Sequence, residues 1–208
     1  MKKTLVVFAN SVKHGKHCVA GKDIQTGNWI RPVSNATGAE LDDEQCRCVN
    51  PHGKFLVKPL QKVEIELLAH YPLLNQPENF LVDNAEWKQR YNIEAHEVNK
   101  YLDSPDTLWG EGNKVVFSHI ESGAVKIEQS LYLVKVDNLE IYKKIDNKRR
   151  VSFSYKGSRY DLPVTDPNFD HHLNNPQHQN ILCVSLGEKY LPKGGENYSC
   201  YKIVASII

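Results

Sequence analysis

Polar and apolar residues alternate most regularly over residues 148–166, in two runs that meet at Lys156-Gly157. A glycine in a two-residue connection supplies the positive φ that a tight hairpin requires. This predicts a hairpin in which Phe153 lies opposite Tyr160. Its apolar face comprises Val151, Phe153, Tyr155, Tyr160 and Leu162, and its polar face comprises Arg150, Ser152, Ser154, Arg159 and Asp161. Such a strand pair can pack on one side and bind a ligand on the other.

Similar patterns predict short strands along most of the chain. Val63, Ile65 and Leu67 alternate with glutamates, which is typical of a half-buried strand, and the last apolar runs indicate buried strands. The predicted strands cover residues 4–9, 17–21, 28–33, 55–71, 114–119, 130–142, 181–186 and 201–208. Residues 34–54 and 166–179 are predicted to be polar loops.

One helix is predicted, at about residues 85–102. Its apolar positions recur at spacings of three and four residues, and they are Trp87, Tyr91, Ala95, Val98 and Leu102. This spacing places them on one helix face, and Pro105 would end the helix.

Short strands with glycine-containing turns and a single helix predict a mainly β protein. Strand groups occur on both sides of the helix, so we expect two small β-barrels joined in one compact unit. We expect residues 1–122 to form the N-terminal barrel with the inserted helix. Residues 123–208 would form the C-terminal barrel.

The composition is that of a soluble globular protein, with 40% hydrophobic and 25% charged residues among 208. No apolar run approaches the length needed to cross a bilayer, and residues 5–9 are too short for a signal peptide. The five cysteines lack a framework spacing, which predicts reduced thiols. We therefore expect a cytoplasmic protein with no membrane partner and no cofactor.

The charge is balanced overall but unevenly distributed. The chain has 26 basic and 25 acidic residues, which argues against a protein that coats nucleic acid through bulk charge. Residues 1–33 nevertheless hold six basic residues and one acidic, and residues 143–160 hold seven and one. These two stretches indicate a focused anion site, or else two lysine-rich faces in contact with solvent.

Several short motifs occur in a characteristic order. They are Cys18-Val-Ala-Gly21, Trp29-Ile-Arg-Pro-Val33, the Arg150-x-x-Phe-x-Tyr155 hairpin, Ser185-Leu-Gly187 and residues 201–208. In order and spacing the chain resembles the bacterial dual OB-containing domain family over nearly its whole length. The resemblance implies two OB folds and a nucleic-acid or nucleotide-binding role, and it transfers no catalytic residue.

Three candidate binding residues lie in the first basic stretch. Trp29 and Arg31 share one side of a strand, where a ring beside a guanidinium group suits a base and a phosphate. Alternatively, Trp29 plugs the barrel and Arg31 pairs with a carboxylate. Lys13 lies with His14, Gly15 and Lys16 in the loop between the first two strands, which is either an anion site or a plain solvated turn.

Arg150 and Arg159, on the polar face of the hairpin, are the strongest candidate pair. We expect them to be near-diagonal neighbours. Phe153 and Tyr160 are assigned to the core, because their face is apolar throughout. A register slip by one residue would make these aromatic residues the binding platform and turn the arginines inward, which the cost of burying charge disfavours.

Metal and catalytic sites are weaker alternatives. Cys46, Cys48 and His52 supply one ligand cluster, which Cys18 or a histidine from His171, His172 and His178 could complete, but zinc ribbons need two closely spaced ligand pairs. We assign no metal. Asp161, Asp166, Asp170 and Glu188 could instead converge on a two-metal hydrolytic site.

The leading hypothesis is a non-catalytic module that binds single-stranded nucleic acid or a nucleotide through Lys13, Trp29, Arg31, Arg150 and Arg159. One alternative is a metal-dependent nuclease or phosphodiesterase. Another is a module that docks a protein partner.

Overall fold

The structure is a computed structural model that describes residues 1–13, 15–175 and 180–208. The chain divides into two units, residues 1–73 with 78–102 and residues 74–77 with 103–208. The sequence placed the boundary after residue 122. The units instead change at residue 102, because Leu108, Val115 and Phe117 belong to the hydrophobic core of the second unit.

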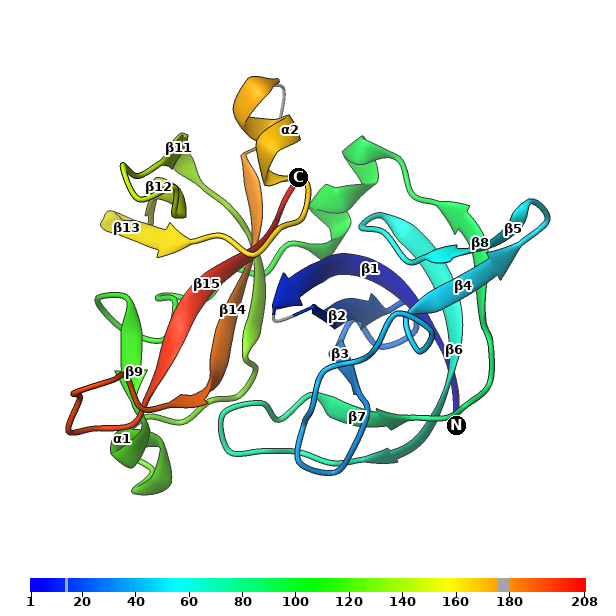
Figure 1. The fold of residues 1–208 in the computed structure, drawn as a ribbon, viewed down its shortest axis with the longest axis horizontal. Coiled ribbons are helices and arrows are strands. Elements are labelled where there is room, and N and C mark those ends of the chain that lie inside the picture. The colour runs from blue at the N-terminus through cyan, green and yellow to red at the C-terminus, as the bar shows by residue number, and fades with distance from the viewer. Residues whose placement is uncertain (14, 176–179) are drawn as a thin grey trace. The chain divides into compact units, whose positions relative to one another are not determined.

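The first unit contains a closed five-stranded barrel (Figure 1). The strands follow the order β1-β2-β3-β7-β6, and β6 pairs again with β1 to close the barrel. Only β3 and β7 are parallel, and the other neighbours in this ring are antiparallel. The barrel strands are β1 (Lys2–Lys13), β2 (Lys16–Asp23), β3 (Trp29–Val33), β6 (Gln61–His70) and β7 (Asn79–Val82).

Three further strands extend the sheet beyond the barrel, and they change two predictions. Part of the expected loop at residues 34–54 forms the hairpin of β4 (Arg47–Asn50) and β5 (Gly53–Leu56). The expected helix is instead β8 (Trp87–Asn92) followed by the 3-10 helix η1 (Ala95–Tyr101). The helical prediction is wrong for β8, because its backbone pairs with β6 and β4 while Trp87 enters the core.

The second unit repeats the strand order in a half-barrel. One sheet follows the order β10-β14-β15-β9 and the other β11-β12-β13, and a parallel bridge between Val164 and Val204 links β13 to β15. If β10 and β11 are taken as one bent strand, the order matches that of the first barrel. The strands are β9 (Lys114–Val116), β10 (Leu131–Lys135), β11 (Asp137–Lys143), β12 (Arg149–Tyr155), β13 (Ser158–Pro163), β14 (Ile181–Tyr190) and β15 (Ser199–Ile207).

Two short helices complete the second unit, and both lie in segments that the sequence analysis expected to be non-helical. Helix α1 (Phe117–Glu121) follows β9 directly, so the predicted strand at residues 114–119 ends early. Helix α2 (Phe169–Asn174) interrupts the polar loop between β13 and β14 and buries Phe169. The chain is mainly β, as predicted, and no helix in the described ranges is long and apolar enough to cross a membrane.

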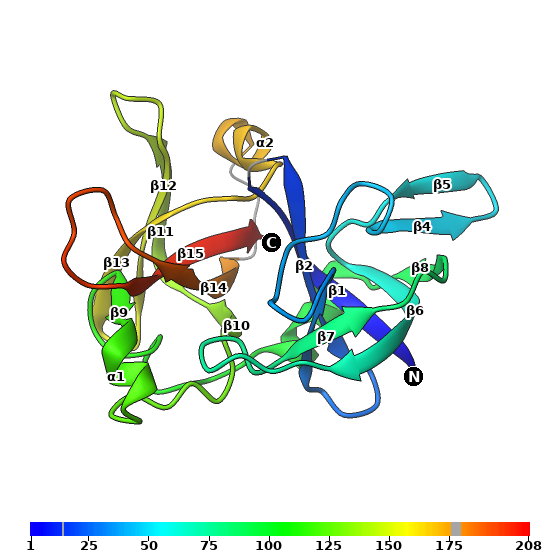
Figure 2. The same ribbon diagram turned by 60° about the horizontal axis from the view of Figure 1, so that its bottom comes forward.

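The hairpin of β12 and β13 confirms the predicted register. Phe153 pairs with Tyr160, and their rings stack with centroids 5.4 Å apart. Lys156 and Gly157 both have positive φ, at 44° and 81°, as a two-residue turn that matches strand twist requires. The five predicted apolar residues are all buried in the core of the second unit. Figure 2 shows the connection between β11 and β12 projecting from its own unit.

Candidate nucleic-acid interface

The central part of the outer face of β1–β3 in the first barrel is buried. Six outward side chains there, which alternate with core residues, have exposed fractions between 0% and 8%, and they are Val6, Phe8, Ala20, Lys22, Trp29 and Arg31. Trp29 packs edge-on against Phe8 with ring centroids 6.0 Å apart. Phe8 also contacts Tyr101 from η1 at 5.3 Å. The stacking surface predicted at Trp29 is therefore not exposed.

The polar groups on this face are used within the first unit. Arg31 donates from Nε and Nη2 to Glu78 Oε1, both at 3.2 Å, and both residues are buried. Lys22 donates from Nζ to the carbonyl of Tyr101 at 2.8 Å and lies 5.2 Å from the centre of the Trp29 ring. Trp29 and Arg31 do share one face, as predicted, but that face is covered.

Lys13 lies at the tip of the β1–β2 hairpin, where it is half-buried and pairs in register with Lys16. The predicted neighbour His14 lies outside the described residues. Val12, beside Lys13, is 38% exposed. The structure thus places two lysines and one partly exposed apolar side chain at this tip.

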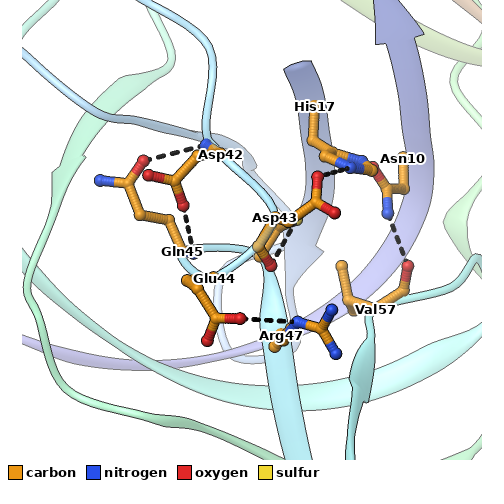
Figure 3. Close-up of polar contacts among 9 residues, drawn as sticks. Asn10, His17, Asp42, Asp43, Glu44, Gln45, Arg47 and Val57 are labelled. Carbon is orange, nitrogen blue, oxygen red and sulfur yellow. Dashed lines mark hydrogen bonds and ion pairs between the residues drawn. The ribbon is translucent and has the colours of Figure 1, made fainter. Parts of the chain in front are cut away.

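An acidic loop is anchored beside the same tip (Figure 3). His17 Nδ1 lies 2.7 Å from Asn10 Oδ1, and His17 Nε2 lies 3.1 Å from Asp43 Oδ1. Asn10 is itself oriented by donating to the carbonyl of Val57 at 2.7 Å. These contacts hold an acidic loop at the start of β2, on the side of the strand to which His17 points, so the potential near the tip of the first hairpin is less positive than its lysines alone would make it.

The outer face of β12 and β13 in the second unit is polar. It carries Arg150, Ser152, Ser154, Arg159 and Asp161. Arg150 donates from Nε to Asp161 Oδ1 at 3.0 Å, and Ser152 donates from Oγ to Glu140 Oε2 at 3.0 Å. This face lies opposite a dry core of Val151, Phe153 and Tyr160, so it has no role in packing that core.

The Arg150 pair has a defined electrostatic setting. Burial alone would raise the pKa of Asp161, but hydrogen bonds from Arg150 and Tyr142 hold that pKa below its ordinary value of 3.8. Burial and the hydrogen bond to Asp161 raise the pKa of the Tyr142 hydroxyl. Asp161 is thus ionised near neutral pH, and the Arg150 guanidinium is partly neutralised by it.

Arg159 differs from Arg150 because it is exposed. No carboxylate lies within ion-pair distance of it in the part of the chain that the structure describes. Arg150 pairs in register with Pro163 and Arg159 with Ser154, so the two arginines stand four residues apart along β13. They are therefore not near-diagonal neighbours. At about 3.3 Å per residue they are roughly 13 Å apart along the strand, a separation that suits two phosphates of one extended chain better than a single phosphate.

Two aromatic residues that the sequence analysis did not single out flank the connection between β14 and β15, one at the end of β14 and the other just before β15. Tyr190 and Tyr198 are 51% and 48% exposed. The Nζ of Lys189 lies 4.8 Å from the Tyr198 ring centre, and Tyr190 contacts Tyr201 edge-on at 6.2 Å. In the sequence, these residues could have been recognised from a lysine beside two tyrosines that flank a glycine-rich turn, a composition that fits base stacking.

The family model described as a dual OB-containing domain matches residues 3–207. This chain belongs to that family. No curated protein matches the chain. A solved structure described as a murine DNA-binding protein bound with double-stranded DNA aligns over 100% of this chain and 97% of its own. Its sequence identity is 9% and its TM-score 0.33, values too low to assign a function to this chain.

In this dual OB-containing domain the shared strand order identifies the corresponding strands of the two units. OB folds bind oligonucleotides across the face of their second and third strands, with help from the loops between strands one and two and between strands four and five. In the second unit these are β12 and β13, the connection at residues 144–148 and the connection at residues 191–198. The polar face, the lysine-rich tip and the tyrosines occupy these three places.

Among the residues that the structure describes in this dual OB domain, the alternative chemical sites are not assembled. Cys46 and Cys48 are buried thiols, and burial raises the pKa of Cys46 to about 12. Both carboxylate oxygens of Asp166 accept backbone N–H groups, from Asn168 and Ile207, while Asp161 accepts from Arg150. Among the described residues, no group of three ligand side chains is placed to hold a metal ion. The predicted ligand His178 lies outside the described residues.

Proposed function

We propose that this protein is a non-catalytic module that binds single-stranded nucleic acid, or a nucleotide, across the outer face of β12 and β13. The observation that carries the proposal is the hairpin register, which places Arg150 and Arg159 on one outward face above a dry core. Guanidinium groups bind phosphates bidentately, and the partly exposed Ser154 beside Arg159 can add a hydrogen bond.

The ends of this face support an extended ligand. Lys144 and Lys148 supply further phosphate contacts, and Tyr190 and Tyr198 offer rings on which bases stack. Stacking contributes about 1–3 kcal/mol per base and depends little on base identity. We therefore expect binding that tolerates many sequences.

In the first unit, Lys13 remains a proposed contact because it lies at a hairpin tip. Trp29 and Arg31 would need their buried face to open before a ligand could touch them, so we give them a structural role. We also propose a cytoplasmic location, because the spacing of the five cysteines is not that of a disulfide framework.

A salt titration with a labelled thymidine oligonucleotide tests the proposal. Each phosphate contact should lower the slope of log affinity against log salt by about 0.7 for a single strand. Arg159→Ala should weaken binding about 3- to 10-fold on all sequences, because a phosphate contact carries no sequence information. The matched control is Arg90→Ala, which removes one exposed arginine that is paired with Glu64 in the first unit.

Two results would overturn the proposal. One is an absence of binding at low salt. The other is an equal effect of Arg159→Ala and Arg90→Ala. Affinity for a protein partner with little salt dependence would favour the docking alternative. Cleavage of the labelled strand only with added Mg²⁺ or Mn²⁺ would favour the nuclease alternative.

A further inference from the structure

The connection between β11 and β12 is a tight turn with an apolar residue at its apex. Asn147 N–H donates to the carbonyl of Lys144 at 2.8 Å, and Lys144 N–H donates to the carbonyl of Lys148 at 3.0 Å. Asn147 has φ of 60°, which gives a type I turn followed by one left-handed residue. Ile145 occupies the first central position of this turn, and its exposed fraction is 107%.

The fold does not require isoleucine at this position. The turn is made by Asn147, which adopts the left-handed conformation, and by Asp146, whose Oδ1 accepts the N–H of Lys148 at 3.3 Å. The first central position of a type I turn accepts most residues. A completely exposed isoleucine adds no burial to the folded state, and an apolar side chain held in water gains only when a ligand covers it.

The surroundings of Ile145 are cationic. Residues 143–150 contain five basic residues and one acidic residue, Asp146. Asp146 is paired with Lys148 at 2.7 Å, which holds its pKa below the ordinary value. Lys144 is exposed beside Ile145. An apolar side chain flanked by cations is complementary to a nucleic-acid strand, because the bases have apolar faces and the backbone carries anionic phosphates.

The base of this hairpin is held in place. Lys143 Nζ lies 2.6 Å and Arg149 Nη2 3.0 Å from the two carboxylate oxygens of Asp170 on α2. The Arg149 guanidinium also lies 5.4 Å from the centre of the Phe169 ring. Because Lys143 and Arg149 are both bound to Asp170, the ends of β11 and β12 are already fixed, and ligand binding at the tip costs little conformational entropy.

We propose that Ile145 inserts between two neighbouring bases of the bound strand, with Lys144 and Lys148 on the flanking phosphates. The proposal rests on the nucleic-acid function proposed above. Proteins that kink nucleic acids use apolar wedges such as isoleucine in this way. Here the insertion would separate one base step and set the direction in which the strand leaves the face of β12 and β13.

Base separation can be measured apart from affinity. A single-stranded oligonucleotide that contains 2-aminopurine fluoresces more strongly when the probe loses a stacked neighbour. Wild-type protein should raise this fluorescence, whereas Ile145→Ala should abolish the rise and weaken binding about 3- to 10-fold, with the salt slope unchanged. Ile145→Leu should restore the fluorescence rise, and Leu68→Ala, which removes an exposed side chain of the first unit, should change neither quantity.

The outcomes separate the two proposals. If wild-type protein does not bind the oligonucleotide, the nucleic-acid function itself fails. If wild-type protein and Ile145→Ala bind equally and neither raises the fluorescence, only the insertion is overturned. If Ile145→Ala loses binding to vesicles of anionic lipid but keeps full oligonucleotide binding, the tip contacts a lipid surface and the insertion is likewise overturned. Equal melting temperatures for wild type and Ile145→Ala would exclude a folding effect.

Discussion

In the first barrel the outward side chains in the central part of β1–β3 are buried, whereas in the half-barrel of the second unit those on β12 and β13 are polar, and all but Ser152 are at least partly exposed. The first set includes Phe8, Ala20 and Trp29, and its cations are bound to Glu78 and to the carbonyl of Tyr101. The second set includes Arg150 and Arg159, of which Arg159 is exposed. One strand order thus supports a packing face in one unit and a solvent-facing surface in the other.

The difference shows that OB strand order alone does not locate a binding face. The outward positions decide it, because apolar residues there gain free energy by being covered and polar residues do not. The same contrast holds for the buried lysines. Lys22 lies on the outer face of its barrel against Trp29, whereas Lys202 lies on the inner side with Cys200 and Val204.

The largest effect expected from this comparison is on stability. Trp29→Ala should lower the free energy of unfolding by about 3–5 kcal/mol, because it leaves a cavity in a packed face. Arg159→Ala, at an outward position of the second barrel, should change it by no more than about 0.5 kcal/mol. Chemical denaturation of both variants measures the contrast. Similar losses in the two would show that both faces are covered.

A second contrast concerns the two arginine–carboxylate pairs. Glu78→Gln leaves the buried Arg31 guanidinium without its carboxylate and should cost about 3 kcal/mol. Asp161→Asn should cost about 1 kcal/mol or less, because the Arg150 pair is partly exposed to solvent.

The pH dependence of the Asp161 contribution has a definite sign. Because the folded-state pKa of Asp161 is lowered, its stabilisation is present above the ordinary value of 3.8 and is lost as the pH falls through the folded-state pKa. The difference in unfolding free energy between wild type and Asp161→Asn should therefore shrink in acid. A difference that stays constant down to strongly acidic pH would contradict this role.

These contrasts also mark how far the sequence could predict the molecule. Regular alternation and the Lys156-Gly157 turn were sufficient for the β12–β13 hairpin, because its register depends on local geometry and one buried face. The sequence also predicted that Trp29 and Arg31 lie on the same side of one strand. It could not predict that this side is buried, because the burial depends on Glu78 and Tyr101, which are distant in the chain. The helix predicted over β8 failed for the same reason, since pairing with β4 and β6 overrides a helical spacing.

The buried lysine of the second barrel predicts a smaller, pH-dependent effect. Burial lowers the pKa of Lys202 to about 8 from 10.5, while its Nζ donates to the carbonyl of Gly110 at 2.6 Å. Between these two pH values the unfolded chain binds a proton that the folded protein has released, so stability rises with pH there. Relative to Lys202→Met, wild type should gain about 1–3 kcal/mol across this window. Parallel curves for the two proteins would show that Lys202 titrates normally.

The smallest expected effect distinguishes the two hairpin tips. Lys144→Ala should weaken oligonucleotide binding about 2- to 3-fold and reduce the magnitude of the salt slope by about 0.7, because one phosphate contact is lost. Lys16→Ala should have less effect, since the acidic loop that the His17–Asp43 contact holds at the start of β2 lowers the positive potential near the first tip. If the Asp43 carboxylate is the reason, Asp43→Asn should strengthen binding and make it more sensitive to Lys16→Ala. Equal effects of Lys16→Ala and Lys144→Ala in the wild-type background would mean that both tips contact the strand, and the contrast between the two barrels would then apply to their strand faces alone.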